Sequence, residues 1–183
     1  MKSMTDRRRR TLFAGVAVAV VVSFVAVRSS HAIGWMLIDA KIRHDFPRVP
    51  RISTGGLATW LGDRARPAPV LLDVRTRAEY DVSHLRGAQR VEPGADITAI
   101  VLPKDRAIVT YCSVGYRSGA VAQRLRDAGY TDVENLDGSI FKWANEGRAV
   151  VRGNKRVAEV HPYNRTWGLL LQKRYRAENA TYQ

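Results

Sequence analysis

The sequence predicts an α/β domain with a mostly parallel central sheet flanked by helices, preceded by one apolar N-terminal helix. Two short, continuous apolar runs, Val70–Val74 and Ala107–Tyr111, are typical of strands buried on both faces of a parallel sheet. The stretch 118–128 carries apolar residues at helical spacing after the second run. The uncharged run Thr11–Val27 predicts the N-terminal helix.

The amino-acid composition limits which classes of protein this chain can belong to. The chain has 183 residues, of which 45% are hydrophobic and 26% charged, a balance that supports one packed domain with extensions and excludes wholesale disorder. The single cysteine excludes an internal disulfide framework, and with four scattered histidines it leaves no zinc site built on paired cysteines. We therefore expect no metal and no cofactor, and any cysteine chemistry must use one thiol.

The chain is strongly basic, with a formal net charge of +13. Six bases and one acid in residues 1–32 account for +5 of this charge, which leaves +8 on the rest. The basic residues are dispersed, without the aromatic-interleaved motif or recognition helix of a nucleic-acid-binding protein. The charge favours a solvated surface that attracts anionic lipid head groups and small anions, so we expect no nucleic-acid partner. Salt-dependent duplex binding would indicate that alternative.

Residues 1–32 predict a targeting or anchoring segment. The arginines Arg7–Arg10 precede the run Thr11–Val27, which spans about 26 Å as a helix, slightly less than the roughly 30 Å of a bilayer core. We favour a signal anchor that keeps the arginines in the cytoplasm, places Trp35 at the far interface and exports the domain.

Other fates of this segment stay open. Residues 30–32, Ser-His-Ala, form an acceptable cleavage site for a secretory signal, which would release a soluble exported domain. The string Arg9–Phe13 fits a twin-arginine signal, and an anchor can also hold the domain on the cytoplasmic face. A buried soluble helix is disfavoured because the run is apolar on every side.

The expected organisation is a signal or anchor segment at 1–32, a linker at 33–51, a folded domain at 52–148 and a C-terminal extension at 149–183. The linker is predicted from the polar stretch Ala40–Arg51, which is broken by Pro47 and Pro50. In the extension, Asn164 can cap a final amphipathic helix that includes Trp167 and 169–171, three leucines. We expect this helix to dock against the domain; the alternative is that it lies on the membrane surface.

Within the domain, turn and cap signals bound each element. Ser and Thr are preferred helix caps, and glycine commonly ends a helix. The expected elements are, in order, a helix from Ser53 or Thr54 to Gly62, the strand Val70–Val74, a helical turn over Ala78–His84, a short strand over Gln89–Glu92, the strand Ala107–Tyr111, a helix over Ser118–Ala128 closed by Gly129, and a strand over Asp132–Leu136.

The sole cysteine, Cys112, stands where the second apolar strand is expected to end and a helix follows. The carboxyl end of a parallel strand faces a helix N-terminus, whose backbone N–H groups and dipole lower the pKa of a thiol. Arg117 adds a permanent cation, and Gly115 lets the backbone curl into an anion-binding nest. The pattern predicts a nucleophilic thiolate; an inert buried thiol and a surface arginine are the alternatives.

Three separated strings resemble the signatures of the rhodanese-like sulfurtransferase family, in the family's order. They are Leu71–Arg75 with Glu79–Tyr80, His84–Leu85 and Gly87–Ala88; the loop Tyr111–Ser118; and Leu136 with Gly138 and Trp143. The resemblance covers residues 52–148 and implies a single-domain rhodanese. Ser83, Arg86 and Ser139 depart from the family pattern, which affects turn geometry rather than the thiol.

The resemblance implies a sulfurtransferase in which Cys112 attacks the outer sulfur of an anionic, thiosulfate-like donor, forms a persulfide and releases sulfite. Arg117 would stabilise donor charge. Asp73 and Arg75 would pair and brace the loop, and His84 would be structural. The loop residues expected to bind the substrate are Ser113, Val114, Gly115, Tyr116 and Ser118, of which Val114 and Tyr116 shape the pocket mouth and Ser118 either donates a hydrogen bond or caps the helix.

The length of the cysteine loop distinguishes two activities that are known in the fold this chain resembles. Four residues lie between Cys112 and Arg117, whereas the family's phosphatases have five, so a persulfide is favoured over a phosphatase or arsenate reductase reaction. Because the chain has no second cysteine, the persulfide needs an external acceptor: cyanide in the test tube, a small thiol or a protein thiol in the cell. A membrane-tethered binding or regulatory module without turnover is the alternative from another class.

Overall fold

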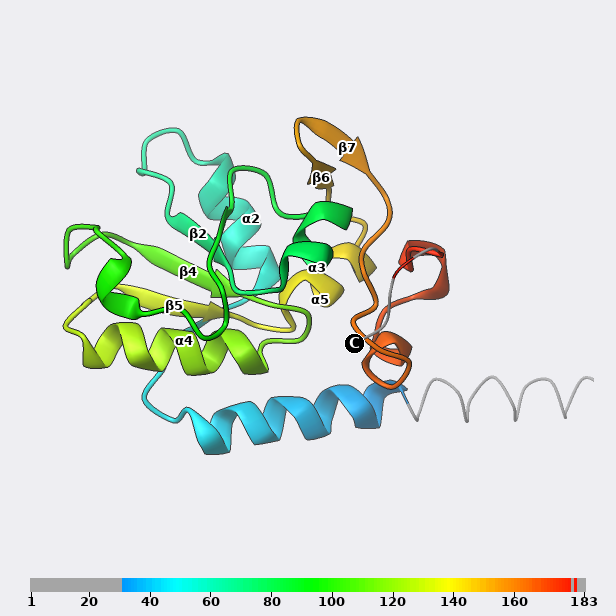
Figure 1. Cartoon of the computed structure of the whole chain (residues 1–183), viewed down its shortest axis with the longest axis horizontal. Coiled ribbons are helices and arrows are strands. Elements are labelled where there is room, and N and C mark those ends of the chain that lie inside the picture. Colours follow the sequence, from blue (N-terminus) through cyan, green and yellow to red (C-terminus); the bar gives the residue numbers. More distant parts are fainter. Residues whose placement is uncertain (1–30, 179, 181–183) are drawn as a thin grey trace, which may run out of the picture. The chain divides into compact units, whose positions relative to one another are not determined.

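The computed structural model describes residues 31–178 and 180, and its central feature is a five-stranded sheet in the order β1–β5–β4–β2–β3 (Figure 1). Its strands are β1 (Arg51–Ile52), β2 (Val70–Asp73), β3 (Gln89–Arg90), β4 (Ile108–Tyr111) and β5 (Val133–Leu136). Every neighbouring pair in this sheet is parallel. The predicted parallel sheet is confirmed, and β4, the strand that leads to the cysteine, is its central strand.

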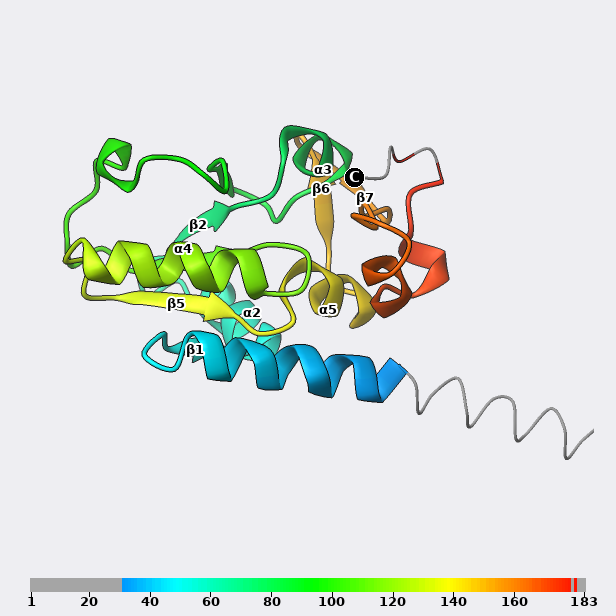
Figure 2. The same ribbon diagram turned by 60° about the horizontal axis from the view of Figure 1, so that its bottom comes forward.

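Helices cover both faces of this sheet. The helices that follow β1 along the chain are α2 (Thr54–Gly62), α3 (Arg77–Val82), α4 (Tyr116–Asp127) and α5 (Ser139–Asn145). In Figures 1 and 2, α4 lies on one side of β5 and α2 on the opposite side. The sheet is therefore the middle layer of three, which is the arrangement that apolar strands without polar alternation require.

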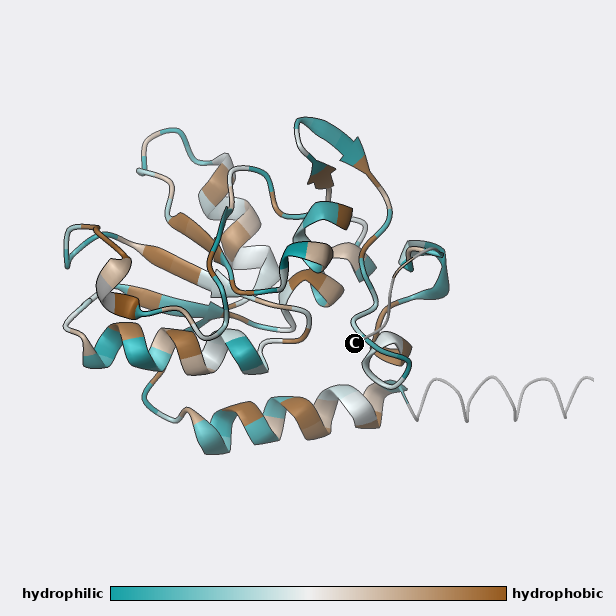
Figure 3. Cartoon of the chain, viewed as in Figure 1, coloured by the Kyte–Doolittle hydropathy of each residue, from teal (hydrophilic) through white to brown (hydrophobic). Residues whose placement is uncertain are grey.

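The central strands are buried on both faces. Leu71, Leu72, Ile108 and Val109 are each at most 3% exposed. Figure 3 shows the apolar residues concentrated along β2 and β4. Each such side chain contributes about 1.5–3 kcal/mol by leaving water, so this layer holds the site-bearing strand in place.

Local signals set the helix boundaries. The Ser53 hydroxyl accepts a hydrogen bond from Gly56 N at 2.9 Å, which confirms the predicted cap of α2. A capping box between Thr76 and Glu79 begins α3. Helix α4 begins at Tyr116 rather than at the predicted Ser118, because Gly115 is its N-cap.

The segment predicted to be a linker is in part a helix. Residues 31–45 are helical, and Ile38 and Ile42, one turn apart, are each 4% exposed. Their spacing places both isoleucines on one buried face of the helix. The linker expectation for 33–51 is therefore wrong over this stretch, because its prolines follow the helix and do not interrupt it.

Close packing fixes the end of this helix on α4. The Phe46 ring lies 5.3 Å from the Tyr116 ring, centroid to centroid. A Cβ on Gly119 would lie only 2.6 Å from Phe46 Cδ2, so the glycine in α4 leaves the space that Phe46 fills. Phe46 therefore packs against both Tyr116 and Gly119 of α4.

The C-terminal extension docks against the domain, as predicted, but with different secondary structure. It contains the antiparallel pair β6 (Val150–Arg152) and β7 (Lys155–Val157) and the 3₁₀ turns η2 (Trp167–Leu170) and η3 (Lys173–Tyr175). The predicted amphipathic helix is therefore wrong. Asn164 Oδ1 accepts from Trp167 N at 2.9 Å, but the N-cap of η2 is Thr166, so the predicted cap at Asn164 is wrong as well. Leu171 is fully buried, and Asn145 Nδ2 of α5 donates to Leu170 O at 2.8 Å.

The predicted anchor over Thr11–Val27 lies outside the described residues. Within 31–178, no helix combines the length and the apolar character needed to cross a membrane. The residues of the site described below all lie at or after Leu37, within one unit of the chain.

Candidate active site

The cysteine loop begins at the carboxyl end of β4 and leads into α4. Gly115 adopts a φ of 108°, a conformation that favours glycine. A Cβ at this position would lie 3.2 Å from Ile42 Cδ1. Glycine therefore permits both the turn of the loop and the close approach of the helix at 37–45.

Hydrogen-bond donors surround the buried sulfur of Cys112. The N–H of Gly115 donates to Sγ at 3.1 Å. Burial raises the pKa of the thiol, but the charge of Arg117, the main-chain and side-chain groups of Ser118 and the Gly115 N–H together bring that pKa below its ordinary value. The site thus favours a thiolate at the base of the loop.

Two polar residues outside the loop hold its backbone. Ser139, at the start of α5, accepts the Cys112 N–H at 3.1 Å through Oγ. Asn135 Nδ2 donates to Gly115 O at 2.9 Å, and Asn135 Oδ1 accepts from the Ser118 hydroxyl at 2.6 Å. Ser118 thus donates to Asn135 and is not the cap of α4, which is Gly115.

Arg117 is held by a carboxylate. Its Nη1 and Nη2 donate to the two oxygens of Glu79 at 2.8 and 2.7 Å, and Nη2 also donates to Ser113 Oγ at 3.0 Å. The sequence predicts that this arginine stabilises donor charge. In the structure its charge is already balanced by Glu79, so its visible role is to fix the loop against α3.

Glu79 is the site residue that sequence reasoning missed. It is fully buried, and it also accepts from Ser113 Oγ at 2.9 Å and from Thr76 N at 3.1 Å. Burial raises its pKa, but Arg117 and Thr76 outweigh this and lower the pKa to about 2. The Thr76-x-x-Glu79 capping box was a readable signal for a helix start, yet it does not reveal the arginine that the fold brings to the same carboxylate.

Asp73 and Arg75 form the predicted pair. Arg75 Nε and Nη2 donate to the Asp73 carboxylate at 2.9 and 2.6 Å, and both side chains are completely buried. Arg75 Nη2 also donates to Ser83 O at 2.6 Å. The pair therefore ties β2 to the turn after α3 and does not touch residues 113–118 through these bonds, so it braces the loop only indirectly.

His84 lies away from the sulfur. Its ring stacks on Tyr80 at 3.9 Å between centroids, and its Nδ1 lies 3.1 Å from Tyr80 O. These contacts agree with the structural role expected of it.

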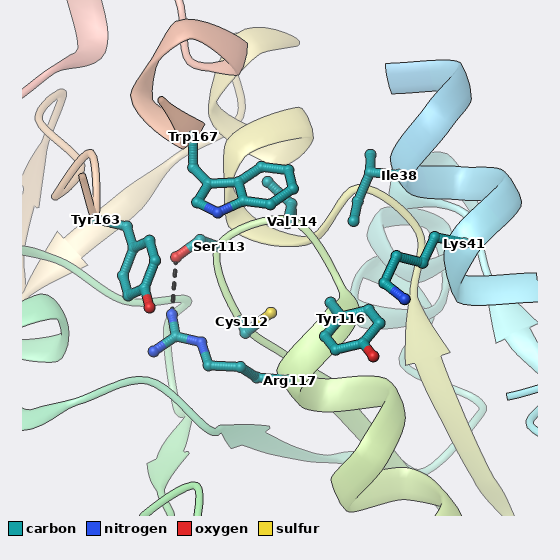
Figure 4. A pocket seen from close by; sticks show the side chains of 9 residues that line it. All are labelled: Ile38, Lys41, Cys112, Ser113, Val114, Tyr116, Arg117, Tyr163 and Trp167. Atoms are coloured by element: carbon teal, nitrogen blue, oxygen red, sulfur yellow. Dashed lines mark hydrogen bonds between the residues drawn. The ribbon is translucent and has the colours of Figure 1, made fainter. Parts of the chain in front are cut away.

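A pocket of about 210 Å³ opens above the sulfur (Figure 4). It is lined by Ile38, Lys41, Cys112, Ser113, Val114, Tyr116, Arg117, Tyr163 and Trp167. Val114 and Tyr116 stand on its wall, where the sequence places them. Ile38, Lys41, Tyr163 and Trp167 come from outside the predicted domain, and the local sequence carries no signal that would have assigned them to the site.

Tyr163 lines the pocket with an unfavourable backbone conformation. Its φ is 65°, an uncommon value for a residue with a side chain. Its N–H donates to His161 Nδ1 at 2.9 Å, and its ring centroid lies 4.6 Å from Arg117 Cζ. The tyrosine therefore covers one face of the guanidinium that Glu79 holds from the edge.

Comparison with known proteins finds a matching family model, related sequences and similar solved structures. The family model described as "Rhodanese-like domain" matches residues 57–146. The chain is 36% identical over 83 residues to a protein named "Sulfurtransferase" from Allochromatium vinosum, with 45% of this chain and 78% of that protein covered. Among solved structures, the "Rhodanese-like domain from Anabaena sp Alr3790 protein" superposes with a TM-score of 0.51 and 27% identity, covering 63% of this chain and 89% of that one.

Other relatives are longer proteins. The chain is 36% identical over 94 residues to the "Probable adenylyltransferase/sulfurtransferase MoeZ" of Mycobacterium tuberculosis, with 49% of this chain covered. It spans only 23% of that protein's length, and 48% of a "tRNA uridine(34) hydroxylase" from Bordetella petrii. The similarity to these proteins is thus confined to one segment of each.

Proposed function

The chain belongs to the rhodanese-like sulfurtransferase family, and from this premise we propose that it moves sulfane sulfur from an anionic, thiosulfate-like donor through a Cys112 persulfide to an external acceptor. The observation that carries the proposal is the sulfur of Cys112 at the floor of a pocket, with the Gly115 N–H 3.1 Å away and a lowered pKa. A thiolate in such a setting is a nucleophile that needs no separate base.

In the first step the Cys112 thiolate attacks the outer sulfur of the donor. A bond forms between Sγ and that sulfur, the donor's S–S bond breaks, and its electron pair leaves with sulfite. The negative charge then lies on the outer persulfide sulfur, where N–H groups of residues 113–118 stabilise it. Arg117 contributes by holding the loop in shape through Glu79 and by its positive charge near the sulfur.

In the second step the acceptor attacks the outer sulfur. The bond between that sulfur and Sγ breaks, and its electron pair returns to Cys112 as thiolate. The chain has one cysteine, so no internal thiol can resolve the persulfide as a disulfide. Cyanide serves as acceptor in an assay, and a small thiol or protein thiol is the acceptor class we propose for the cell.

We expect the full-length chain treated with thiosulfate to gain about 32 Da, the mass of one sulfur, and to form thiocyanate catalytically when cyanide is added. Mass spectrometry of the intact protein and a colorimetric thiocyanate assay measure the two events. Added sulfur without turnover would indicate a carrier that waits for a specific acceptor. If the chain neither gains sulfur nor forms thiocyanate, the proposal is contradicted and a binding module is favoured.

We further propose that the N-terminal segment holds the domain at a membrane with the domain exported. The support is the uncharged run Thr11–Val27 behind Arg7–Arg10. A reporter enzyme that works only outside the cytoplasm, fused after Gln183, is expected to be active. A reporter that works only inside the cytoplasm is the matched control, and activity of that one alone would place the domain on the cytoplasmic side.

A further inference from the structure

The wall of the pocket above Cys112 is largely apolar and is built from three parts of the chain. Trp167 and Tyr163 enter from the C-terminal extension, and Ile38 from the helix at 37–45 (Figure 4). Val114 and the ring of Tyr116 complete it from the loop. In Figure 4 these side chains surround the opening toward the sulfur, so a molecule that reaches Cys112 must lie against them.

Both cations on this wall already have counter-charges. Arg117 is bound by both oxygens of Glu79 at 2.7 and 2.8 Å, and the Tyr163 ring lies over it. Lys41 Nζ binds Asp45 Oδ2 at 2.8 Å and lies 5.0 Å from the Tyr116 ring centroid. Asp45 itself also accepts from the Tyr116 hydroxyl at 2.7 Å. The residues that line the pocket therefore offer no cation without a partner carboxylate.

We propose that this pocket selects, as sulfur acceptor, a small thiol with an uncharged apolar body over a thiol that carries a carboxylate. The inference rests on the proposed sulfur transfer and names the acceptor class for that same site. The acceptor thiolate attacks the outer persulfide sulfur, a new S–S bond forms on the acceptor, and the bond to Sγ breaks and leaves the Cys112 thiolate. The product is the acceptor's persulfide, and no oxidant or reductant is consumed.

The selectivity follows from solvation. An apolar body that leaves water for the faces of Trp167, Ile38 and Val114 gains free energy with the area it buries. A carboxylate at the far end of the same body would lie away from the loop N–H groups that stabilise charge at the sulfur. It would lose its hydration against an apolar wall and find no unpaired cation to replace it. A pocket of about 210 Å³ has room for one aromatic ring on a short aliphatic arm.

The backbone conformation of Tyr163 is a second observation that links the pocket wall to the active site. A φ of 65° at a residue with a side chain is retained only where the surroundings over-determine it. Here the His161 Nδ1 acceptor at 2.9 Å holds the backbone, and the ring is placed against Arg117. The extension therefore presents a fixed aromatic surface to whatever approaches the sulfur.

The test uses the full-length chain loaded with sulfur from thiosulfate and freed of excess donor. Single-turnover transfer is then measured to 2-phenylethanethiol and to 3-mercaptopropionate at equal thiolate concentration, with cyanide as a third acceptor. We expect transfer to 2-phenylethanethiol to be at least about tenfold faster per molar acceptor, the effect of about 1.4 kcal/mol of differential binding. Loss of the added 32 Da from the protein reports each transfer.

Variants of one 3₁₀ turn make the test specific. Trp167→Ala is expected to lower the preference for 2-phenylethanethiol about fivefold or more, whereas Trp167→Phe should keep most of it. Leu169→Ala is the matched control, because Leu169 lies in the same turn η2, is 63% exposed and does not line the pocket. It should leave the preference unchanged.

The outcomes separate the inference from the function on which it rests. Loading and cyanide transfer with equal rates for the two thiols would overturn the acceptor class alone. A preference that Trp167→Ala leaves intact would overturn the assignment of this wall. Failure to load sulfur at all would overturn the proposed sulfur transfer and this inference with it.

Discussion

Cys112→Ser is expected to abolish sulfur transfer, with turnover reduced by at least about 10³-fold and no sulfur added by thiosulfate. The serine hydroxyl is nearly isosteric with the thiol and can accept the same Gly115 N–H, now 3.1 Å from Sγ. Its pKa, however, is far too high for the loop to hold it as an anion. The substitution therefore removes the nucleophile and leaves the pocket that surrounds it.

Thermal unfolding and circular dichroism of the variant should match those of the unchanged chain, since the buried volume hardly changes. A thiocyanate assay and intact-protein mass measure the activity and the loading. Persistent turnover in Cys112→Ser would exclude the persulfide mechanism. Loss of turnover together with loss of the fold would be recognised by the unfolding curve, and Cys112→Ala then provides a second substitution without a hydroxyl.

Glu79→Gln is expected to destabilise the protein by about 2–4 kcal/mol near neutral pH, because it leaves the Arg117 charge without its carboxylate in a largely buried site. The Glu79 oxygens accept from Arg117 at 2.7 and 2.8 Å and from Ser113 Oγ at 2.9 Å. A glutamine supplies one acceptor and turns one amide group toward donors. Sulfur transfer should fall with stability, because the loop loses its tie to α3.

The pH dependence of stability distinguishes a charge effect from a packing effect. Glu79 has a pKa lowered from the usual 4.5 to about 2, so its stabilisation is complete above the unfolded value and is lost as pH falls through the folded one. The unchanged chain should lose about 3 kcal/mol of unfolding free energy from this group between about pH 5 and pH 2. Glu79→Gln should lack that part of the slope.

Urea unfolding of both proteins across this pH range is the measurement. Asp81→Asn is a matched control in the same helix, because Asp81 is 53% exposed and pairs with the exposed Arg77 one turn away. Exposed pairs of this kind contribute about 0.3–0.5 kcal/mol, so this variant should be nearly as stable as the unchanged chain. Equal pH slopes in Glu79→Gln and the unchanged chain would contradict the assignment.

The parts of the fold that sequence predicted are those with local signals. β2 and β4 are continuous apolar runs, the Ser53 cap lies next to the helix it begins, and the loop from Cys112 to Arg117 is contiguous. Such features depend on neighbours within a few residues. The layering then follows, because apolar strands need helices on both faces, whereas the order of the strands is known only from the structure.

The parts that sequence missed depend on contacts between distant residues. Ile38 and Ile42 are each 4% exposed, whereas Leu37 in the same helix is 61% exposed, so the apolar residues alone do not show which face is buried. Trp167 reaches the pocket through a 3₁₀ turn that follows Pro162, and no pattern near it points to the thiol. The Glu79 contact to Arg117 joins residues 38 positions apart, which a capping signal cannot show.

The pocket wall has a consequence for how such a protein can diversify. The nucleophile, its loop and the carboxylate that fixes the loop all lie within residues 57–146, whereas Ile38, Lys41, Tyr163 and Trp167 flank that stretch on either side. Substitutions in the two flanking segments can therefore change which acceptor the pocket binds. The reacting cysteine and its loop need not change with them.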